Sequence, residues 1–245
     1  MAERERRPRM TRRLLVAAMA GAILIPATIW LALRQESEEE TMPTDESATI
    51  IGLPEPRHSS GTSVEEALLK RRSVRSYRAE PLTLAQLSQL LWAAQGITSP
   101  RGLRSAPSAG ALYPLEVYVV AGNVSGLESG VYRYGPEHHD LTLVALGDKR
   151  AALAAAALGQ VWIRRAPIDL IFSAVYERTT KKYGLRGAQY VHMEVGHAAE
   201  NVYLQAVALN LGSCVIGAFH DDGVRKVIQM PDSEQPLYIM SVGRR

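Results

Sequence analysis

An uncharged, mostly apolar run from Leu14 to Leu33 is the feature that most constrains how this chain can be organised. Its length of about twenty residues is enough for a helix to cross a hydrocarbon core of roughly 30 Å, and Pro26 inside it does not forbid that. A cleaved signal peptide is the competing interpretation, but its apolar region is usually shorter, about 7–15 residues. Ala27 and Ala32 also lie in poor surroundings for cleavage. The run therefore favours an uncleaved transmembrane anchor.

The charges around this run are unevenly distributed. Residues 1–34 hold seven arginines against two glutamates, whereas residues 35–46 hold six carboxylates and no base. Arginines that precede an apolar span stay on the cytoplasmic side, so we expect a protein anchored in the cytoplasmic membrane with its large domain outside. Arg12 and Arg13 resemble a twin-arginine export signal, although two of many arginines can also be adjacent by chance.

The sequence predicts four segments: a basic cytoplasmic segment 1–13, an anchor or export signal 14–33, an acidic flexible linker 34–60, and one folded domain 61–245. A nucleic-acid binder usually shows a basic stripe with interleaved aromatic residues. Here the net charge is +3 and aromatic residues make up 6% of the chain, so nucleic acid is excluded as a partner. Cys214 is the only cysteine, and its apolar neighbours predict a buried, inert thiol.

Helical and strand patterns alternate through the folded domain. Ser63 and Thr83 each have Glu or Gln three residues later, a capping-box spacing that starts a helix, and Gly96 is predicted to end the second of these helices. A long helix is predicted from about Gly187 to Leu211, with Gly212 stopping it. Strands are predicted at 115–120, 130–134, 141–144, 167–175, 212–219 and 237–242.

The histidines do not form a recognisable metal site. His192 and His197 are five residues apart, which places their rings about 140° apart on a helix, whereas zinc-binding pairs share one face. We interpret the polar residues of this helix as a stripe at a helix–helix or subunit contact: Glu194, His197, Glu200 and Asn201. The paired His138 and His139 lie in a predicted turn and are interpreted as solvent-facing.

Two stretches are candidate ligand-binding segments. The stretch 104–114 combines small residues, a glycine and two prolines directly before a predicted strand, which suits close approach of backbone to a flat ligand. The stretch 71–75 holds three arginines and a serine, which suits a phosphate cradle. An ordinary turn and a solvated basic patch remain open alternatives for these two stretches.

The run Pro107-Ser108-Ala109-Gly110-Ala111-Leu112-Tyr113-Pro114 is similar to a signature of the SagB/thiazole-oxazole oxidase branch of the FMN-dependent nitroreductase superfamily. Matching stretches follow the expected order at 71–77, 194–219 and 243–245, so the resemblance covers roughly Ser63 to the end. It implies an α+β fold with a mostly antiparallel sheet flanked by helices. It also implies an intertwined homodimer with FMN at two subunit-interface sites.

Carried over by position, the resemblance implies that Arg71 and Ser73 contact the phosphate and ribityl chain, and that Arg75 faces the pyrimidine edge of the ring. The backbone N–H of Gly217 would reach the N5/O4 edge, and a C-terminal arginine would close over the phosphate. The partner subunit would line the ring with residues 107–110. The implied cofactor-binding set is Arg71, Arg72, Ser73, Arg75, Arg104, Pro107, Ser108, Ala109, Gly110, Ile216, Gly217, Arg244 and Arg245.

Lys182 and Tyr183 match a Lys-Tyr pair that removes a proton in the azoline-oxidising branch, and a lysine made less basic by burial or a nearby arginine suits that role. They lie in the stretch 178–184, which is polar and mobile-looking; a surface lysine is the alternative. The predicted outside location departs from the azole-forming enzymes, which work with a cytoplasmic cyclodehydratase. We therefore expect FMN-dependent hydride transfer with a small organic substrate. The alternatives are an NAD(P)H-dependent nitro or quinone reductase, a non-catalytic FMN-binding redox module, and an extracytoplasmic binding domain without flavin.

Overall fold

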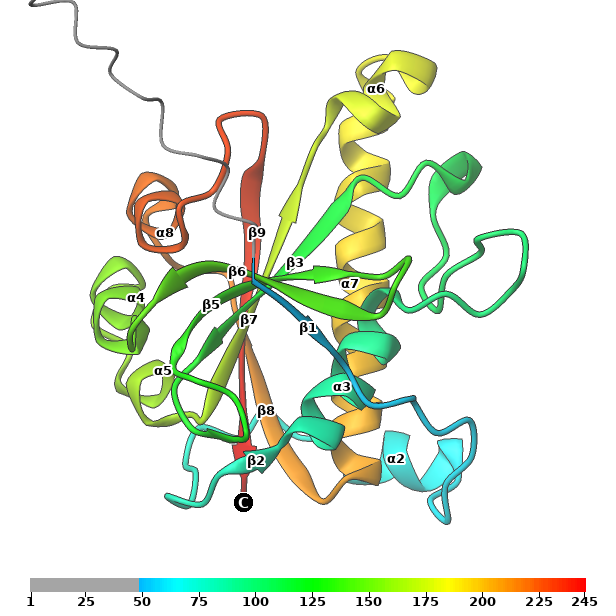
Figure 1. Cartoon of the computed structure of the whole chain (residues 1–245). Coiled ribbons are helices and arrows are strands. Elements are labelled where there is room, and N and C mark those ends of the chain that lie inside the picture. Colours follow the sequence, from blue (N-terminus) through cyan, green and yellow to red (C-terminus); the bar gives the residue numbers. More distant parts are fainter. Residues whose placement is uncertain (1–48) are drawn as a thin grey trace, which may run out of the picture. The chain divides into compact units, whose positions relative to one another are not determined.

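The computed structural model describes residues 49–245, and the predicted segments 1–13 and 14–33 lie outside this part. Its centre is a seven-stranded sheet in the order β1-β6-β5-β3-β7-β9-β8, and every neighbouring pair in it is antiparallel (Figure 1). The strands are β1 (Ile50–Gly52), β3 (Leu115–Ala121), β5 (Gly130–Gly135), β6 (Asp140–Leu146), β7 (Ile168–Ala174), β8 (Leu211–Ile216) and β9 (Gln235–Arg244). The short strands β2 (Leu82–Thr83) and β4 (Val124–Ser125) pair separately in parallel.

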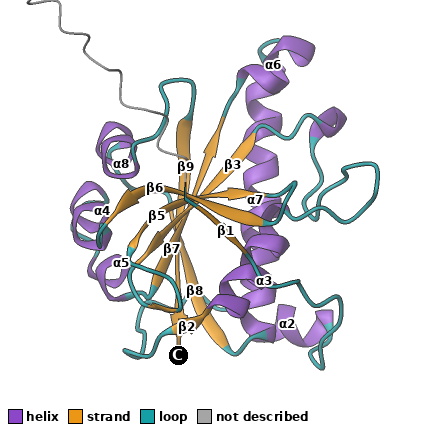
Figure 2. Ribbon diagram, in the orientation of Figure 1, coloured by secondary structure: helices purple, strands orange, loops and turns teal. Residues whose placement is uncertain are grey.

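Helices cover both faces of the sheet, so the predicted α+β class with a mostly antiparallel sheet is confirmed (Figure 2). The helices are α2 (Val64–Lys70), α3 (Leu84–Gln95), α4 (Arg150–Ala156), α5 (Val161–Arg165), α6 (Glu177–Tyr183), α7 (Arg186–Ala208) and α8 (Asp221–Ile228), with a 3₁₀ turn at Ala109–Ala111. Helices α3 and α7 lie on one face, and α4, α5 and α8 lie on the other.

Strand β3 shows why the sheet needs two layers of helices. Val117 and Val119 join the core under α3 and α7, whereas Tyr118 and Val120 join the core under α4, α5 and α8. A central strand whose alternate side chains enter two cores reads as a continuous apolar run rather than as an alternating one. The predicted strands at 115–120, 130–134, 141–144, 167–175 and 237–242 are all confirmed.

Local capping fixes the start of α3 as predicted. The Thr83 hydroxyl accepts a hydrogen bond from the Gln86 amide at 3.1 Å, and the Gln86 side chain accepts one from the Thr83 amide at 3.0 Å. Gly96 follows the last helical residue, and a Cβ there would lie 2.3 Å from the Trp92 ring. A glycine is therefore required where the chain turns away from this tryptophan.

The folded unit begins earlier than the predicted boundary at residue 61. Strand β1 pairs with β6, with Ile51 opposite Leu141, and the Arg57 amide donates to the Gln89 side chain at 2.7 Å. The predicted linker 34–60 is therefore wrong from Ile50 onward. The polar composition of this segment suggested a tether. In the structure, however, it pairs through its backbone and makes a few apolar contacts with residues that are far away in the sequence.

The stretch 178–184 is helical in α6, so the expected mobile loop is wrong. Thr179 is buried, and Gly187 of α7 approaches α6 so closely that a Cβ on it would lie 2.9 Å from the Thr180 Cα. Helix α6 has no apolar stripe of its own, so its helical state depends on tertiary packing.

The long helix also ends earlier than expected. Helix α7 stops at Ala208, Asn210 takes a left-handed backbone conformation with φ of 56°, and Gly212 already lies in β8. No helix within residues 49–245 is both long and apolar enough to cross a membrane.

Candidate functional site

The small-residue stretch 104–114 forms a turn, referred to below as the 104–114 turn, at the end of the sheet where β3 begins and β7 ends. Leu115 pairs with Ala174 there, and α6 follows β7 directly. The turn backbone is strained, because Ala111 and Tyr113 adopt φ values of 53° and 46°, a region that L-residues rarely enter. The Ser108 hydroxyl helps to hold it by accepting a hydrogen bond from the Tyr113 amide at 2.9 Å.

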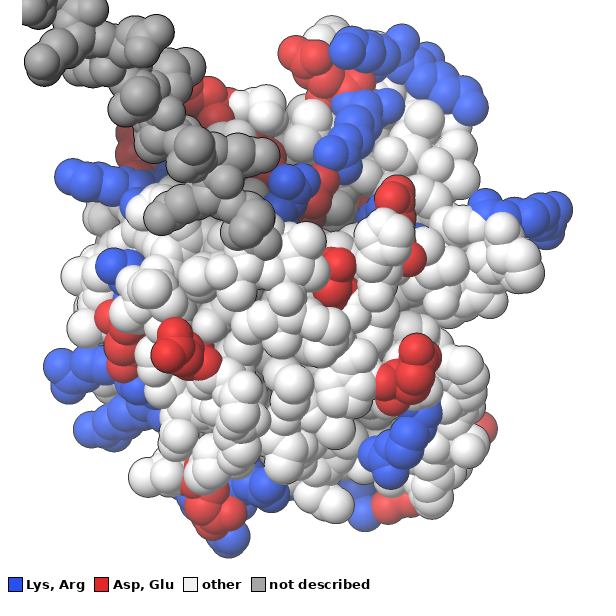
Figure 3. Space-filling view, in the orientation of Figure 1, with Lys and Arg blue, Asp and Glu red and all other residues white. Residues whose placement is uncertain are grey.

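The predicted catalytic pair lies against Gly110 of this turn. A Cβ built on Gly110 would lie 2.7 Å from the Tyr183 hydroxyl and 2.9 Å from the Lys182 ammonium nitrogen. Gly110 also has a φ of 64°, so both its conformation and its surroundings exclude a side chain. Lys182 itself is exposed in a single chain, so burial, one of the two causes considered for a less basic lysine, does not act there. Lys and Arg side chains crowd the surface over α6 (Figure 3).

Glu194 is the site residue whose role the sequence did not indicate. It is only 2% exposed, and one carboxylate oxygen has no hydrogen-bond partner among the described residues. Burial raises the pKa of Glu194 to about 7, while a hydrogen bond with Ser108 and the charge of Arg104 act against that rise. It therefore lies beneath the turn rather than in a uniform polar stripe, and its neighbour on the same helix, His197, is exposed.

Two further contacts attach the 104–114 turn to the helices. The Asn201 side chain of α7 donates a hydrogen bond to the Ser105 carbonyl at 3.3 Å. The Arg104 guanidinium lies 4.6 Å from the centre of the Tyr113 ring and donates to the Gln95 side chain of α3 at 3.0 Å. Burial lowers the pKa of Arg104, which shows that this cation is partly removed from water.

The second candidate stretch, referred to below as the arginine segment (71–75), runs parallel to the edge strand β8. Ser73 bridges to Ser213, and the Val74 amide donates to the Ser213 carbonyl at 2.9 Å. Gly212 permits this approach, because a Cβ on it would lie 2.7 Å from Val74. The Ser73 hydroxyl lies 3.3 Å from the Tyr203 hydroxyl of α7. The segment is thus a fixed part of the fold rather than a free basic patch.

The arginines of the arginine segment are arranged in order along β8. Arg71 lies over the Tyr203 ring at 5.1 Å and 3.8 Å from the Glu200 carboxylate, and Arg75 lies over the Trp162 ring at 5.6 Å. Arg72 is exposed and donates to backbone carbonyls of its own helix end. Because the segment is parallel to β8, Arg75 lies nearer than Arg71 to the end at which Gly217 follows Ile216.

The C-terminal arginines meet the same edge strand at its start. Arg244 pairs with Leu211, and its carbonyl accepts a hydrogen bond from the Arg78 amide at 2.9 Å. Its side chain lies 3.4 Å from the Glu80 carboxylate, while Arg245 is exposed. Backbone pairing therefore brings Arg244 beside the arginine segment, although its guanidinium contacts Glu80 whereas that of Arg71 contacts Glu200.

Within one chain, residues 107–110 of the turn and the arginine segment contact α7 at different places. Ser108 adjoins Glu194 of α7, whereas Arg71 adjoins Glu200 of the same helix. Six residues correspond to about 9 Å along a helix and about 120° around it. The ring-lining residues 107–110 and the phosphate-contacting residues 71–73 implied by the resemblance thus lie on different sides of α7.

His139 is not solvent-facing, contrary to the prediction. It lies 2.7 Å from the Ser88 hydroxyl and 2.8 Å from the Tyr134 hydroxyl, and burial lowers its pKa. His138 is exposed, as expected. Cys214 is buried, as predicted, and this burial raises the pKa of its thiol.

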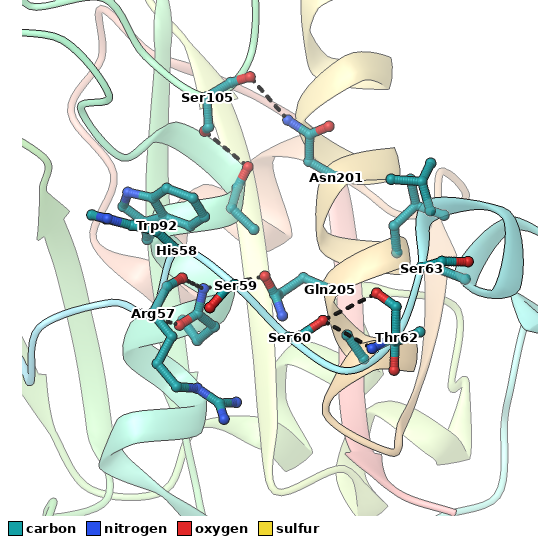
Figure 4. Close-up of a pocket in the computed structure, with 16 residues that line it drawn as sticks. Arg57, His58, Ser59, Ser60, Thr62, Ser63, Trp92, Ser105, Asn201 and Gln205 are labelled. Atoms are coloured by element: carbon teal, nitrogen blue, oxygen red, sulfur yellow. Dashed lines mark hydrogen bonds between the residues drawn. The ribbon is translucent and has the colours of Figure 1, made fainter.

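A cavity of about 320 Å³ between residues 57–64, α3 and α7 was not predicted (Figure 4). The His58 ring packs at 5.4 Å from the Trp92 ring, and Gln89 bridges Arg57 to Gln205. This cavity was not predicted because residues 57–60 were assigned to the linker and most of its other lining residues, Ser105 of the 104–114 turn excepted, lie on predicted helices.

A comparison with family models covers most of this fold, including the arginine segment and the 104–114 turn. The family model described as the nitroreductase family matches residues 68–244. The chain belongs to the nitroreductase family. As a member of this family it is an FMN-dependent oxidoreductase, which agrees with the sequence resemblance.

Individual relatives of this nitroreductase-family chain support the assignment. A Methanocaldococcus jannaschii protein provisionally named a nitroreductase is 52% identical over 182 residues, 74% of this chain and 91% of that protein. A solved structure from Ralstonia eutropha, also provisionally named a nitroreductase, has a TM-score of 0.71 and 33% identity, covering 80% of this chain and 89% of that one. The microcin B17-processing protein McbC of Escherichia coli is 27% identical over 169 residues, 66% of this chain and 62% of that protein.

The residues present in this nitroreductase-family chain fit a flavin nucleotide. Arginine forks and a serine hydroxyl on a fixed edge are the donor types that a phosphate requires. Gly110, at which a Cβ would meet Tyr183 and Lys182, lets these two side chains approach the backbone of the turn. In the part of the chain that the structure describes, no three His, Cys, Asp or Glu residues are grouped as metal ligands.

Proposed function

We propose that this protein is a SagB-type, FMN-dependent dehydrogenase that transfers hydride between a small organic substrate and FMN. The observation that carries this proposal is the position of Lys182 and Tyr183 against Gly110 of the 104–114 turn. The resemblance assigned proton removal to the pair and ring contact to the turn, and the fold brings the two together. The match with a microcin B17-processing protein is a second support for this branch of the family.

The cofactor would be held along the edge strand β8. Arg71 and Ser73, with Arg244 beside them, would bind the phosphate, and Arg75 would face the pyrimidine edge of the ring. The amide of Gly217, next to Ile216, would lie at the far end of the same strand. When bound, FMN supplies a reversible acceptor and donor of hydride. The fixed charge of Arg75 would favour the anionic form produced by reduction.

We propose a homodimer because the 104–114 turn lies on a different side of α7 from the arginine segment. Residues 107–110 of one subunit would then complete the site of its partner. In this arrangement Lys182 and Tyr183 would reach a substrate stacked on the ring. The pair would take the proton that a C–H or N–H substrate loses as its hydride leaves.

The test of the catalytic pair is the double variant Lys182→Ala with Tyr183→Phe. We expect turnover of an azoline-type substrate to fall by about 10²–10⁴-fold, the usual effect of removing general acid–base catalysis, with FMN content unchanged. The matched control is Lys181→Ala, one residue away and also exposed on α6. If the double variant retains wild-type turnover, the pair does not handle the proton and the SagB-type assignment fails.

The second candidate is an NAD(P)H-dependent reductase of nitro compounds or quinones, which family membership alone favours. Anaerobic addition of NADPH or NADH to the purified protein distinguishes the two. Bleaching of the flavin absorption within the time of one turnover supports the reductase. No bleaching, together with substrate-driven bleaching, supports the dehydrogenase. A protein that binds FMN and shows neither reaction would instead be a redox module.

We also propose that residues 14–33 anchor the protein in the cytoplasmic membrane with the folded domain outside. The support is the arginine-rich segment before the apolar run and the acidic segment after it. Fractionation of cells that express the full chain, followed by protease treatment of spheroplasts, tests this topology. Digestion of the domain in intact spheroplasts is expected, and complete protection would contradict the orientation.

A further inference from the structure

A second cavity, of about 520 Å³, lies beside Tyr113 of the 104–114 turn and is lined by three arginines. Arg104 comes from the turn, Arg133 from β5 and Arg178 from α6, and Glu116 of β3 lies among them. We refer to it as the arginine cavity. The resemblance placed Arg104 in the cofactor-binding set, whereas Arg133, Arg178 and Glu116 belong neither to that set nor to the Lys182–Tyr183 pair.

The carboxylate of Glu116 is fully engaged by two of these arginines. Arg133 contacts one of its oxygens at 2.9 Å, and Arg178 contacts the other at 2.6 Å. The side chain of Glu116 is only 11% exposed, so water competes little for these contacts. This arrangement shows that the cavity wall can bind a carboxylate through two guanidinium forks.

Arg104 is the cation that this carboxylate does not neutralise. Within residues 49–245 no carboxylate lies within 4 Å of its guanidinium, which instead contacts the Gln95 amide oxygen and the Tyr113 ring. Glu116 and, more weakly, Glu194 of α7 act on its charge only through space. A guanidinium has five N–H donors, so several donors of Arg104 remain for a ligand. A partly desolvated cation with free donors favours an anion.

We propose that the arginine cavity binds the carboxylate of a small organic acid and is the subsite for the anionic end of the substrate. The planar fork of arginine matches a carboxylate in two-point contacts, and Glu116 shows that arginines of this wall already pair with a carboxylate. Leu112, Tyr113 and Pro136 form an apolar side of the cavity for the carbon skeleton of the acid. This subsite role rests on the proposed hydride-transfer function, whereas binding of the acid does not.

The cavity is connected to the proposed catalytic pair through α6 and the turn. Arg178 and Lys182 are four residues apart on α6 and therefore lie on the same face of that helix. The Arg178 guanidinium also donates to the Tyr113 carbonyl at 3.1 Å. An acid held in the arginine cavity would thus extend from Arg178 towards Lys182 and Gly110.

Binding is tested by calorimetric titration of the full-length, FMN-loaded protein with benzoate and with its neutral isostere benzamide. We expect benzoate to bind at least tenfold more tightly, and its affinity to fall as NaCl is raised. Arg133→Gln and Arg104→Gln should each weaken benzoate at least tenfold, while Arg101→Gln, in the exposed loop before the turn, should not. Equal binding of benzoate and benzamide, or benzoate binding that survives both substitutions, would overturn the proposal. Inorganic phosphate that binds as tightly as benzoate would also overturn the assignment to carboxylates.

The subsite role has a separate kinetic readout. 4-Nitrobenzoate and 4-nitrobenzyl alcohol differ in one carboxylate, and both can be mixed as oxidants with protein whose flavin has first been reduced by dithionite. Arg133→Gln should raise the concentration that gives half the maximal rate of flavin reoxidation about tenfold or more for the first compound only. An equal change for both compounds would contradict the subsite. If benzoate binds as expected but no hydride transfer is found with any substrate, the proposed function fails and the acid-binding cavity stands.

Discussion

Gly110 is the residue at which the 104–114 turn and α6 come closest, so it is the most informative single substitution. Gly110→Ala places a methyl group at positions 2.7 Å from the Tyr183 hydroxyl and 2.9 Å from the Lys182 nitrogen, at a φ of 64°. Gly126→Ala is the matched control, because Gly126 has a φ of 80° and no atom within 4 Å of a built Cβ. Both should lose about 1–2 kcal/mol of stability from the backbone alone. Only Gly110→Ala should lower turnover tenfold or more in a steady-state assay; equal activity of the two variants would contradict the contact.

Glu194 is a single residue that makes the stability of the folded protein depend on pH. Its pKa of about 7 in the fold lies above the value near 4.3 of an unfolded glutamate, so the folded state keeps a proton that the unfolded state has lost. Stability contributed by this group is therefore present below about pH 4.5 and is lost as the pH rises to about 7. Urea unfolding at pH 5 and pH 8 should show Glu194→Gln to be the more stable protein at pH 8 by roughly 1–2 kcal/mol, with a smaller difference at pH 5. Exposed Glu177→Gln should follow the wild type, and an unchanged pH profile in Glu194→Gln would contradict the buried charge.

At the scale of elements, the structure separates what local sequence can specify from what it cannot. The Thr83–Gln86 capping box and the apolar run of β3 act within a few residues, and both were predicted correctly. Helix α6 was missed because its residues are polar and its helical state depends on contact with Gly187 of the next helix. Glu194 was interpreted only as part of a polar stripe at a helix–helix or subunit contact, because the turn that buries it is more than eighty residues away in the sequence. Proximity of Lys182 to Gly110 could be expected only from the family resemblance.

Strand β1 lies in the segment that we predicted from the sequence to be a linker. A truncation measures how much this strand contributes to the stability of the fold. A chain that begins at residue 61 loses the pairing of Ile51 with Leu141 and the apolar contacts of Leu53. We expect it to be less stable than the chain 49–245 by roughly 2 kcal/mol or more, since two half-buried aliphatic side chains are removed. Thermal unfolding of the two chains tests this, and equal midpoints would show that β1 adds nothing to the fold.

At the scale of the whole molecule, the arrangement supports the proposal that two chains complete the site. The arginine segment follows one edge strand, while the turn, the Lys182–Tyr183 pair and the arginine cavity are grouped around the start of β3 and α6. The first group is suited to a nucleotide and the second to substrate and proton transfer. The outer edge of β8 is covered by the arginine segment, so the proposed cofactor shared between two copies would lie against this segment.

The flavin content of the purified protein tests this account most directly. Wild-type protein should carry one FMN per chain, and Arg71→Ala should raise the FMN dissociation constant at least tenfold, because it removes a charge-assisted contact to phosphate. The exposed Arg101→Ala should bind FMN as the wild type does. A colourless wild-type protein that takes up no added FMN, or an Arg71→Ala variant with unchanged affinity, would contradict the account.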